Sequence, residues 1–550
     1  MLKKLLLLIS LALLICLSGY GQKKSKAITK SPEPTPVAVA TPVQTAFYNI
    51  RQFGATGDGK TLDSPAINKA IEKCAYDGGG TVYFPAGNYL SGSIRLKSNI
   101  NLFLDAGSRI VGAPQEMNAY DPSEPFEVPA YQDGGHTYFH NSLIWGENLS
   151  NVSITGTGMI DGGGLERNDK PQDVISGYAA WGKPNYVAPA VIPDISTVRL
   201  GNKAIALKLC KNVLLRDFSM FHGGHFAILA TGCERITFNN LTIDTNRDGI
   251  DIDCCKNFTV SDCRINSPQD DGLCLKSSYA LGRKVICENG TITNCQVSGF
   301  LEGTLLDGTM KWKEDGTGRI KFGTESNGGY RNITVSNCTF RSCRGLALEE
   351  VDGGIMENIT ISNIAMMDVA LYPIFIVTGK RNRGPNVTSV STAKNILVSN
   401  IVITGMESRK GIQSAIQING LPEQPIDGLR LENIRITYNG AGTAADAAIQ
   451  LPDLGIGYPE VRITTPAYGV YAQYVKNLEL ANIHVSYLNE DLRPPMICKS
   501  VEGLEIENFK AQVATGVEPA KFENVQGLVV RNSPLLEPKK SPEVSPKKRK

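Results

Sequence analysis

The amino-acid sequence predicts an all-β fold, a right-handed single-stranded parallel β-helix (β-solenoid) with a short capping helix near its N-terminus. Three observations support this prediction. A short motif with alternating apolar residues recurs through most of the 550-residue chain. The closest copies begin 22 to 26 residues apart, which is the length of one solenoid coil. The 55 glycines agree with a fold that contains many tight turns.

Each copy of the motif has alternating apolar positions and then an asparagine that is followed by another apolar residue. An alternation of period 2 is typical of a strand with one buried face, and stacking of the coils buries one continuous core. Leucine-rich repeats have a similar length, but their Leu-dense consensus and helical segments are absent. The copies begin at Asn212, Arg235, Asn257, Asn289, Asn332, Asn358, Asn395, Gly428, Asn477 and Gly503.

The asparagine of the motif is expected to form a column of stacked amides at a tight turn. The next position holds cysteine in three copies, and we expect Cys263, Cys295 and Cys338 to be buried as small apolar side chains. Of the 13 cysteines, only a few are therefore expected to form disulfides, with a connectivity that the sequence does not reveal. The asparagine column comprises Asn240, Asn294, Asn337, Asn363, Asn400, Asn433, Asn482 and Asn508.

Residues 63–76 are expected to form the capping helix. Asp63 is a candidate N-cap and Pro65 fits the first turn, while Ala66, Ala70, Ile71 and Cys74 give an apolar stripe. Such a helix would cover the open end of a solenoid, whose strand edge would otherwise pair with other chains.

The two ends of the chain differ in composition from the repeats. Residues 1–21, with Lys3, Lys4 and an apolar stretch of about 13 residues, predict a signal peptide and no membrane span. A lipid anchor at Cys16 is the alternative to simple secretion or periplasmic export. We expect 22–45 to be a disordered linker, 46–535 the β-helix domain and 536–550 a basic disordered tail. A net charge of +2 gives no indication of nucleic acid as a partner, and a monomer is the default expectation.

Three aspartates stand out within the repeats. Asp248 and Asp270 are 22 residues apart, which is the step between neighbouring motif copies, so we expect them in adjacent coils about 4.8 Å apart, with Asp271 beside them. Clustered carboxyls hold a proton to higher pH, and glycosidases use a protonated carboxyl with an ionised one. Turn aspartates beside glycine are the structural alternative.

NRDGIDIDCCKN and SPQDDGLCLKSS resemble the polygalacturonase-like glycoside hydrolases of family 28, whose pattern is NTDGIDI followed one coil later by GDDC and a lysine. FGATGDGKTLDSPAINKAI, GGGTVYFPAGNYL and LIWGENLSNVSITGTGMIDGGG are similar to the same pectin-lyase-like β-helix superfamily. The resemblance covers about residues 48–532. It implies hydrolysis of a pectic polysaccharide by an inverting reaction without metal or cofactor. It also implies that Asp270 is the general acid and that Asp248 and Asp271 hold and deprotonate the water. Lys276 stands at the position of the family's lysine.

An inverting reaction normally needs opposing carboxyls about 6.5–9.5 Å apart, and we expect adjacent coils to meet that separation. Two departures concern substrate recognition. Thr317 stands where the family has the histidine of GHG, and Glu349 replaces the lysine of RIK. We expect Arg319 and Lys321, one coil earlier, to bind the sugar carboxylate instead. Glu349 is expected to bind sugar hydroxyls or to pair with one of those cations.

Each of the other candidate residues has two possible interpretations. His225 lies 23 residues before Asp248 and either borders the cleft or is structural; Trp312 and Tyr279 stack on sugars or pack in loops. Asp251 is expected to support Asp248, and Asp253 to lie in a turn or on a solvated face. The insertions 161–200 and 298–318 would favour exo-action by blocking one end of a cleft. A calcium-dependent lyase that performs β-elimination and an inactive sugar-binding solenoid remain alternatives to the hydrolase.

Overall fold

The computed structural model of the chain describes residues 47–124, 136, 138–165, 201–384, 387–406, 411–452 and 463–537. All of them belong to the compact unit Ala46–Lys550. The predicted signal peptide with Cys16, the linker, most of the insertion 161–200 and nearly all of the basic tail lie outside the described residues. No helix among the described residues is long and apolar enough to cross a membrane.

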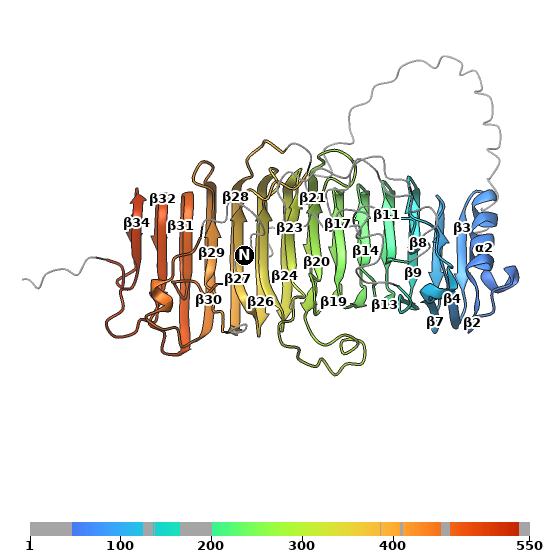
Figure 1. Ribbon diagram of the computed structural model, residues 1–550, viewed down its shortest axis with the longest axis horizontal. Helices are drawn as coiled ribbons and strands as arrows, with labels where there is room; N and C mark the ends of the chain where they lie inside the picture. Colours follow the sequence, from blue (N-terminus) through green and yellow to red (C-terminus); the bar gives the residue numbers. More distant parts are fainter. Residues whose placement is uncertain are drawn as a thin grey trace, which may run out of the picture. The chain divides into compact units, whose positions relative to one another are not determined.

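The described unit is a parallel β-helix, as the repeats predict. Every pairing between its named strands is parallel, and each strand pairs with the equivalent strand of the next coil. The coils follow one another in sequence order from α2 to β34 (Figure 1). Up to β22 each coil contributes three short strands, and from β24 onward long strands serve two faces of the helix.

The first face carries the candidate site. It is formed by β5 (Ile94–Arg95), β8 (Ser142–Glu147), β11 (Lys203–Lys208), β14 (Phe226–Thr231), β17 (Asp248–Asp253), β20 (Leu273–Ser277), β23 (Ile320–Ser326), β25 (Arg344–Glu350), β27 (Ala370–Thr378), β29 (Ile416–Asn419), β31 (Val470–Asn489), β32 (Met496–Glu507) and β34 (Lys521–Gln526).

The second face holds most of the motif copies. It is formed by β1 (Phe47–Asn49), β3 (Gly80–Phe84), β6 (Ile100–Leu104), β9 (Ser150–Gly156), β12 (Lys211–Arg216), β15 (Glu234–Asn239), β18 (Lys256–Ser261), β21 (Cys287–Thr293), β24 (Gly329–Arg341), β26 (Ile355–Met367), β28 (Thr392–Met406) and β30 (Ile426–Gly440), with part of β31.

The third face has the shortest strands and leads into the turns before the first face. It is formed by β2 (Asp58–Leu62), β4 (Gly87–Ser91), β7 (Ser108–Gly112), β10 (Met159–Asp161), β13 (Ser219–Phe221), β16 (Thr242–Asp244), β19 (Arg264–Asn266), β22 (Gln296–Ser298) and β33 (Lys510–Ala511). The last strand, β35 (Val529–Arg531), pairs with β32 and continues the second face. Short 3-10 helices are η1 (Ile50–Phe53), η2 (Gln115–Met117) and η4 (Asp446–Ala448).

From Asn337 to Asn508 the asparagine column forms the predicted amide ladder, whereas Asn240 and Asn294 donate to Asp217 and Asp262. All eight members adopt a left-handed backbone with φ between 51° and 57°, which asparagine tolerates better than most residues. The Asn400 side-chain amide donates to Asn363 at 3.1 Å and accepts from Asn433 at 2.9 Å. The motif's first residues form a second ladder, in which Arg235 Nε takes the place of an amide and donates to Asn212 Oδ1 at 2.6 Å.

The interior is one continuous apolar core that runs through the coils. Cys263, Cys295 and Cys338 are buried in it, as predicted for their column, and all twelve described cysteines are free thiols. The expectation of a few disulfides is therefore not met among the described cysteines. Ten of the twelve belong to the continuous core, where a thiol packs as a small apolar group, and Cys254 and Cys274 are buried outside it.

The capping helix is α2 (Ser64–Tyr76), which lies at the β2–β3 end of the coils (Figure 1). Pro65 occupies its first turn as predicted, but Asp63 makes no side-chain capping bond. Instead its carboxylate accepts from the backbone N–H groups of Thr56 and Gly57, at 2.7 and 3.0 Å. Ile67, rather than Ala66, belongs to the fully buried stripe.

Candidate active site

The three aspartates meet at the edge where the third face turns into the first. Asp248 is the first residue of β17, and Asp270 and Asp271 lie in the turn between β19 and β20. One carboxylate oxygen from each residue lies within 4.8 Å of one from each of the others. This is closer than the separation of about 6.5–9.5 Å expected for an inverting pair, so the distance alone does not identify the stereochemistry.

The register of β17 and β20 corrects one detail of the predicted stacking. Ile250 pairs with Leu273, an offset of 23 residues, and Gly249 N donates to Asp271 O at 3.1 Å. Asp271, rather than Asp270, is therefore level with Asp248. The cause is one additional residue in the turn: Asp244 to Ile250 spans six steps, whereas Asn266 to Leu273 spans seven.

Asp248 lies in an environment that favours its neutral form. The residue is 2% exposed, and its Oδ1 has no hydrogen-bond partner among the described residues. Burial, and then the charges of Asp270 and Asp251, raise the pKa of Asp248 well above its usual range. The cluster therefore retains a proton at pH values where an exposed aspartate has lost it.

Asp271 lies between two buried cations. Arg319 Nε donates to its Oδ1 at 2.8 Å, and Lys321 Nζ lies 3.3 Å from its Oδ2. Glu349 lies on the other side of both cations, 3.7 Å from Arg319 Nη2 and 3.8 Å from Lys321 Nζ. Two acidic and two basic side chains thus form one buried ionic group that fixes the Asp271 carboxylate in place.

This arrangement bears on the predicted roles of Arg319, Lys321 and Glu349. Arg319, Lys321 and Glu349 are 1%, 4% and 0% exposed, and Glu349 pairs with both cations rather than with one. The geometry gives them a positioning role toward Asp271. A contact of these residues with the substrate carboxylate stays a prediction.

Asp270 is the most exposed of the three aspartates, at 34% of its side chain. Arg247 Nη2 lies 3.2 Å from its Oδ2, and Arg247 Nη1 lies 3.1 Å from His225 Nδ1. His225 is fully buried, so it contacts the site through Arg247. The sequence-based reasoning missed Arg247, although it stands where the NTDGIDI pattern has threonine.

Lys276 is held between two acids on the outer side of the first face. Its Nζ lies 3.4 Å from both Asp251 Oδ2 and Glu325 Oε2, and 3.2 Å from His136 Nε2. Burial acts to lower the pKa of Lys276, but these two carboxylates outweigh burial and raise it. Burial raises the pKa of Asp251 to about 8. Asp251 thus faces the cluster, as predicted.

Asp253, by contrast, is neither in a turn nor on a solvated face. It is fully buried in β17 and accepts hydrogen bonds from Ser278 N and Ser278 Oγ, at 2.7 and 2.5 Å. An alternating strand normally exposes this position, but here the chain that follows β20 folds over it and supplies the donors.

A second buried ionic group continues from Glu325. Its carboxylate lies 3.0 Å from Arg383 and 3.5 Å from Arg381, and Arg381 forms a two-point pair with Asp352. Burial acts to raise the pKa of Glu325, but Lys276, Arg381 and Arg383 lower it well below its usual value. Arg381 and Arg383 therefore anchor the network that supports Lys276.

The segment 299–318 supports the turn that carries Asp270. Thr317 N donates to Pro268 O at 3.2 Å, and Gly318 N donates to Asp270 O at 2.9 Å. Thr317 contacts the turn through its backbone N–H. Its side chain is buried, because the residue is only 4% exposed. Trp312, in the same segment, is 54% exposed, and Tyr279 is half-buried. Stacking of either ring on a sugar stays a prediction.

The aspartate cluster is also the one place among the described residues where three acidic groups are spaced for a metal ion. Carboxylate oxygens suit Ca²⁺ and Mg²⁺. However, Arg247, Arg319 and Lys321 already neutralise Asp270 and Asp271, and Asp248 favours its protonated form. These features weaken the cluster as a cation site and suit it to proton transfer.

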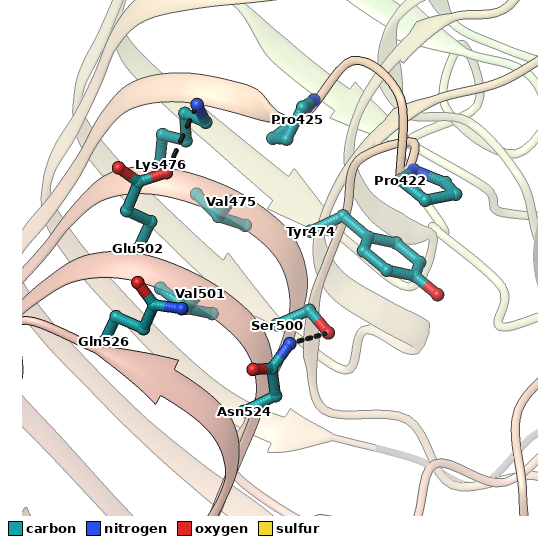
Figure 2. Close-up of a pocket in the computed structure, with 10 residues that line it drawn as sticks. All are labelled: Pro422, Pro425, Tyr474, Val475, Lys476, Ser500, Val501, Glu502, Asn524 and Gln526. Atoms are coloured by element: carbon teal, nitrogen blue, oxygen red, sulfur yellow. Dashed lines mark hydrogen bonds and ion pairs between the residues drawn. The ribbon is translucent and has the colours of Figure 1, made fainter.

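A cavity lies elsewhere on the helix. It has a volume of about 320 Å³ and lies along β31, β32 and β34 (Figure 2). From β20 the pairings pass through β23, β25, β27 and β29 to β31, a distance of about 24 Å at ~4.8 Å per coil. Glu502 is its single acidic lining residue and pairs with Lys476 at 3.2 Å. This cavity lacks the two carboxyls that glycoside hydrolysis requires.

Comparison with known proteins agrees with this geometry. Residues 47–274 match the family model "Rhamnogalacturonase A/epimerase, pectate lyase-like", and residues 321–451 match "Glycosyl hydrolases family 28". Each of these models matches less than half of the chain, and the match to family 28 lies in residues 321–451. The site and these matches are those of a polygalacturonase-like glycosidase.

The relatives of the chain are distant. A probable polygalacturonase of Vitis vinifera is 25% identical over 413 residues, 70% of this chain and 74% of the relative. An exopolygalacturonase of Platanus acerifolia is 25% identical over 418 residues, 73% and 92% of the two chains. The solved family 28 exopolygalacturonase of Yersinia enterocolitica superposes with a TM-score of 0.61 at 19% identity, over 89% of this chain and 79% of that one, and supports the fold.

Proposed function

We propose that the chain hydrolyses a pectic, galacturonate-containing polysaccharide by an inverting reaction that uses no metal ion. The observation that carries this proposal is the cluster of Asp248, Asp270 and Asp271, in which one carboxylate oxygen from each lies within 4.8 Å of the others. The cluster combines a carboxyl that favours its proton, Asp248, with one that lies against two buried cations, Asp271. That combination is what general acid and base catalysis of glycoside cleavage requires.

Asp270 is the proposed general acid. Burial, and then the charge of nearby Asp270, raise the pKa of Asp248, so a proton is held next to Asp270. Of the two residues, Asp270 is the one exposed to solvent. It protonates the glycosidic oxygen as the bond to the anomeric carbon breaks, and Arg247 then stabilises the carboxylate that forms.

Asp271 is the proposed general base. Its contacts with Arg319 and Lys321 hold the carboxylate in one orientation, in which it accepts a proton from the attacking water. Asp248 holds this water from the opposite side. Water adds to the anomeric carbon in a single displacement, so the new hydroxyl has the opposite anomeric configuration.

The same proposal includes exo-action outside the cell. The segment 299–318 is hydrogen-bonded to the turn of Asp270 and can close one end of a cleft. Relatives named exopolygalacturonase agree with this mode. Secretion or periplasmic export rests on the predicted signal peptide at 1–21.

The test is reducing-sugar release from polygalacturonate, rhamnogalacturonan and their oligomers in the presence of a chelator. We expect wild type and the remote control Asp427→Asn to release sugar, and Asp270→Asn to be at least ~100-fold slower, as for the loss of a general acid. Release of single units from chain ends with little loss of viscosity identifies exo-action. Activity that requires Ca²⁺ and produces unsaturated uronates would replace the hydrolase with a lyase.

A further inference from the structure

A second cluster lies on the same edge of the helix, toward the N-terminus from the catalytic aspartates. His222 Nδ1 lies 2.8 Å from Asp161 Oδ1, and Arg109 pairs with the other oxygen of the Asp161 carboxylate. Asp161 is 5% exposed, whereas the His222 side chain is 39% exposed. A buried carboxylate, itself held by an arginine, thus fixes a solvent-accessible imidazole.

The strand register gives the position of this cluster relative to the catalytic residues. Asp161 pairs with Phe221 and Phe221 with Asp244, and His222 N donates to Asp244 O at 3.3 Å. His222 therefore lies in the turn one coil before the turn that leads to Asp248. One coil is about 4.8 Å, close to the length of one sugar unit in an extended polysaccharide.

The hydrogen bond to Asp161 determines what His222 can offer to a ligand. It places a proton on Nδ1, so Nε2 is left for a ligand. Nε2 has no hydrogen-bond partner among the described residues. When the ring is protonated, Nε2–H is a cationic donor on the cleft edge, suited to a carboxylate.

We propose that His222, oriented by Asp161 and Arg109, binds the carboxylate of a uronate residue one sugar away from the bond that is cleaved. The inference rests on the proposed function, since it assumes an acidic polysaccharide in the cleft. It assigns to His222 a subsite that binds a negatively charged group of the substrate. Arg319 and Lys321 are themselves neutralised by Asp271 and Glu349.

The neighbours of His222 make its charge depend on pH. The hydrogen bond that His222 donates to Asp161 raises the pKa of His222 despite its partial burial; the charge of Glu302 adds to this effect and that of Arg109 opposes it. Phe221 lies against the ring, with 3.4 Å between ring centroids. Glu302 belongs to the segment 299–318, which runs from this cluster to the turn of Asp270. Binding of a carboxylate by His222 should therefore be strong in mild acid and weaken above the His222 pKa.

The experiment measures binding by calorimetry in the slow variant Asp270→Asn, with trigalacturonate as the probe. We expect His222→Gln, added to this variant, to weaken binding about 5- to 30-fold at pH 5.5 and to have little effect at pH 8.5. His484→Gln is the matched control, because His484 is half-buried on the distant strand β31. It should change nothing.

Two further arms separate recognition from structural damage. Methyl-esterified trigalacturonate has no charge, so its affinity should not depend on His222. Asp161→Asn should lower the pKa of His222 and move the pH dependence of binding to lower pH, whereas a purely structural defect would weaken binding equally at all pH values.

Equal affinity of Asp270→Asn with and without His222→Gln at pH 5.5 would overturn this inference alone, because binding of the acidic oligomer would persist. A loss that is the same for the charged and the esterified probe would also overturn it. Absence of any binding of oligogalacturonates by Asp270→Asn, with no hydrolysis by wild type, would overturn the proposed function as well.

Discussion

Replacement of Arg319 by methionine tests the role of the buried cations directly. Arg319 is 1% exposed and lies between Asp271, at 2.8 Å, and Glu349, at 3.7 Å. Methionine retains much of the side-chain volume but leaves two buried carboxylates with Lys321 as their remaining close cation. Removal of one partner from a buried ion pair typically costs about 3–5 kcal/mol of stability.

An exposed pair of similar chemistry provides the control. Arg331 donates to Glu357 at 2.5 Å, but its side chain is 38% exposed, so Arg331→Met should cost at most ~1 kcal/mol. We also expect the double variant Arg319→Met with Glu349→Gln to recover part of the loss, because it restores one cation opposite one carboxylate. Coupling between contacting residues is commonly about 0.5–3 kcal/mol.

The assay is urea unfolding followed by circular dichroism, together with kcat and KM on the substrate identified above. A positioning role predicts a fall in kcat, since Asp271 loses its shortest hydrogen bond, and a smaller change in KM. A rise in KM with unchanged kcat would instead support the prediction that Arg319 binds substrate. Stability of Arg319→Met within ~1 kcal/mol of wild type would refute the account of a buried ionic group.

Three other predictions concern the strand acids, the ladder and the stereochemistry. Since burial raises the pKa of Asp251 to about 8, its contribution to stability is present in acid and decreases as the pH rises through 8. Asp251→Asn should therefore gain stability relative to wild type between pH 4 and 9, and urea midpoints that stay parallel would contradict this. Asn400→Ala should lose about 2–4 kcal/mol, from two amide bonds and a left-handed φ of 56°, and Asn400→Gly should lose less. Proton NMR of the first product should show inverted anomeric configuration. A retained configuration would contradict this prediction and would agree with the short separation of the carboxylates.

Much of the fold followed from the sequence because the β-helix is nearly one-dimensional. Each coil contacts mainly the coils before and after it, so a local motif with a fixed period determines the stacking. The asparagine ladder, the buried cysteine column and the capping helix were predicted for this reason. The position of Asp270 along the helix axis was not predicted correctly. One additional residue in the turn 267–272 changes the offset between paired residues of neighbouring coils from 22 to 23.

The sequence by itself determined which aspartates come together. Asp248, Asp270 and Asp271 meet because the coil length brings residues about one period apart onto the same edge of the helix. Only the tertiary structure decided what surrounds them. Arg247, Glu325, Arg381 and the cluster around His222 come from different coils and loops, and a repeat period does not reveal which long side chains meet across them.

The pairing of buried charged side chains is the clearest example of what the repeat period does not reveal. From the sequence, Arg319 and Lys321 are two cations near an acidic site and appropriate for a sugar carboxylate. In the structure, Asp271 and Glu349 neutralise both, because a buried cation is stable only beside buried anions. Burial is a property of the assembled coils, and it decides whether a charged side chain faces the substrate or supports the residue that does.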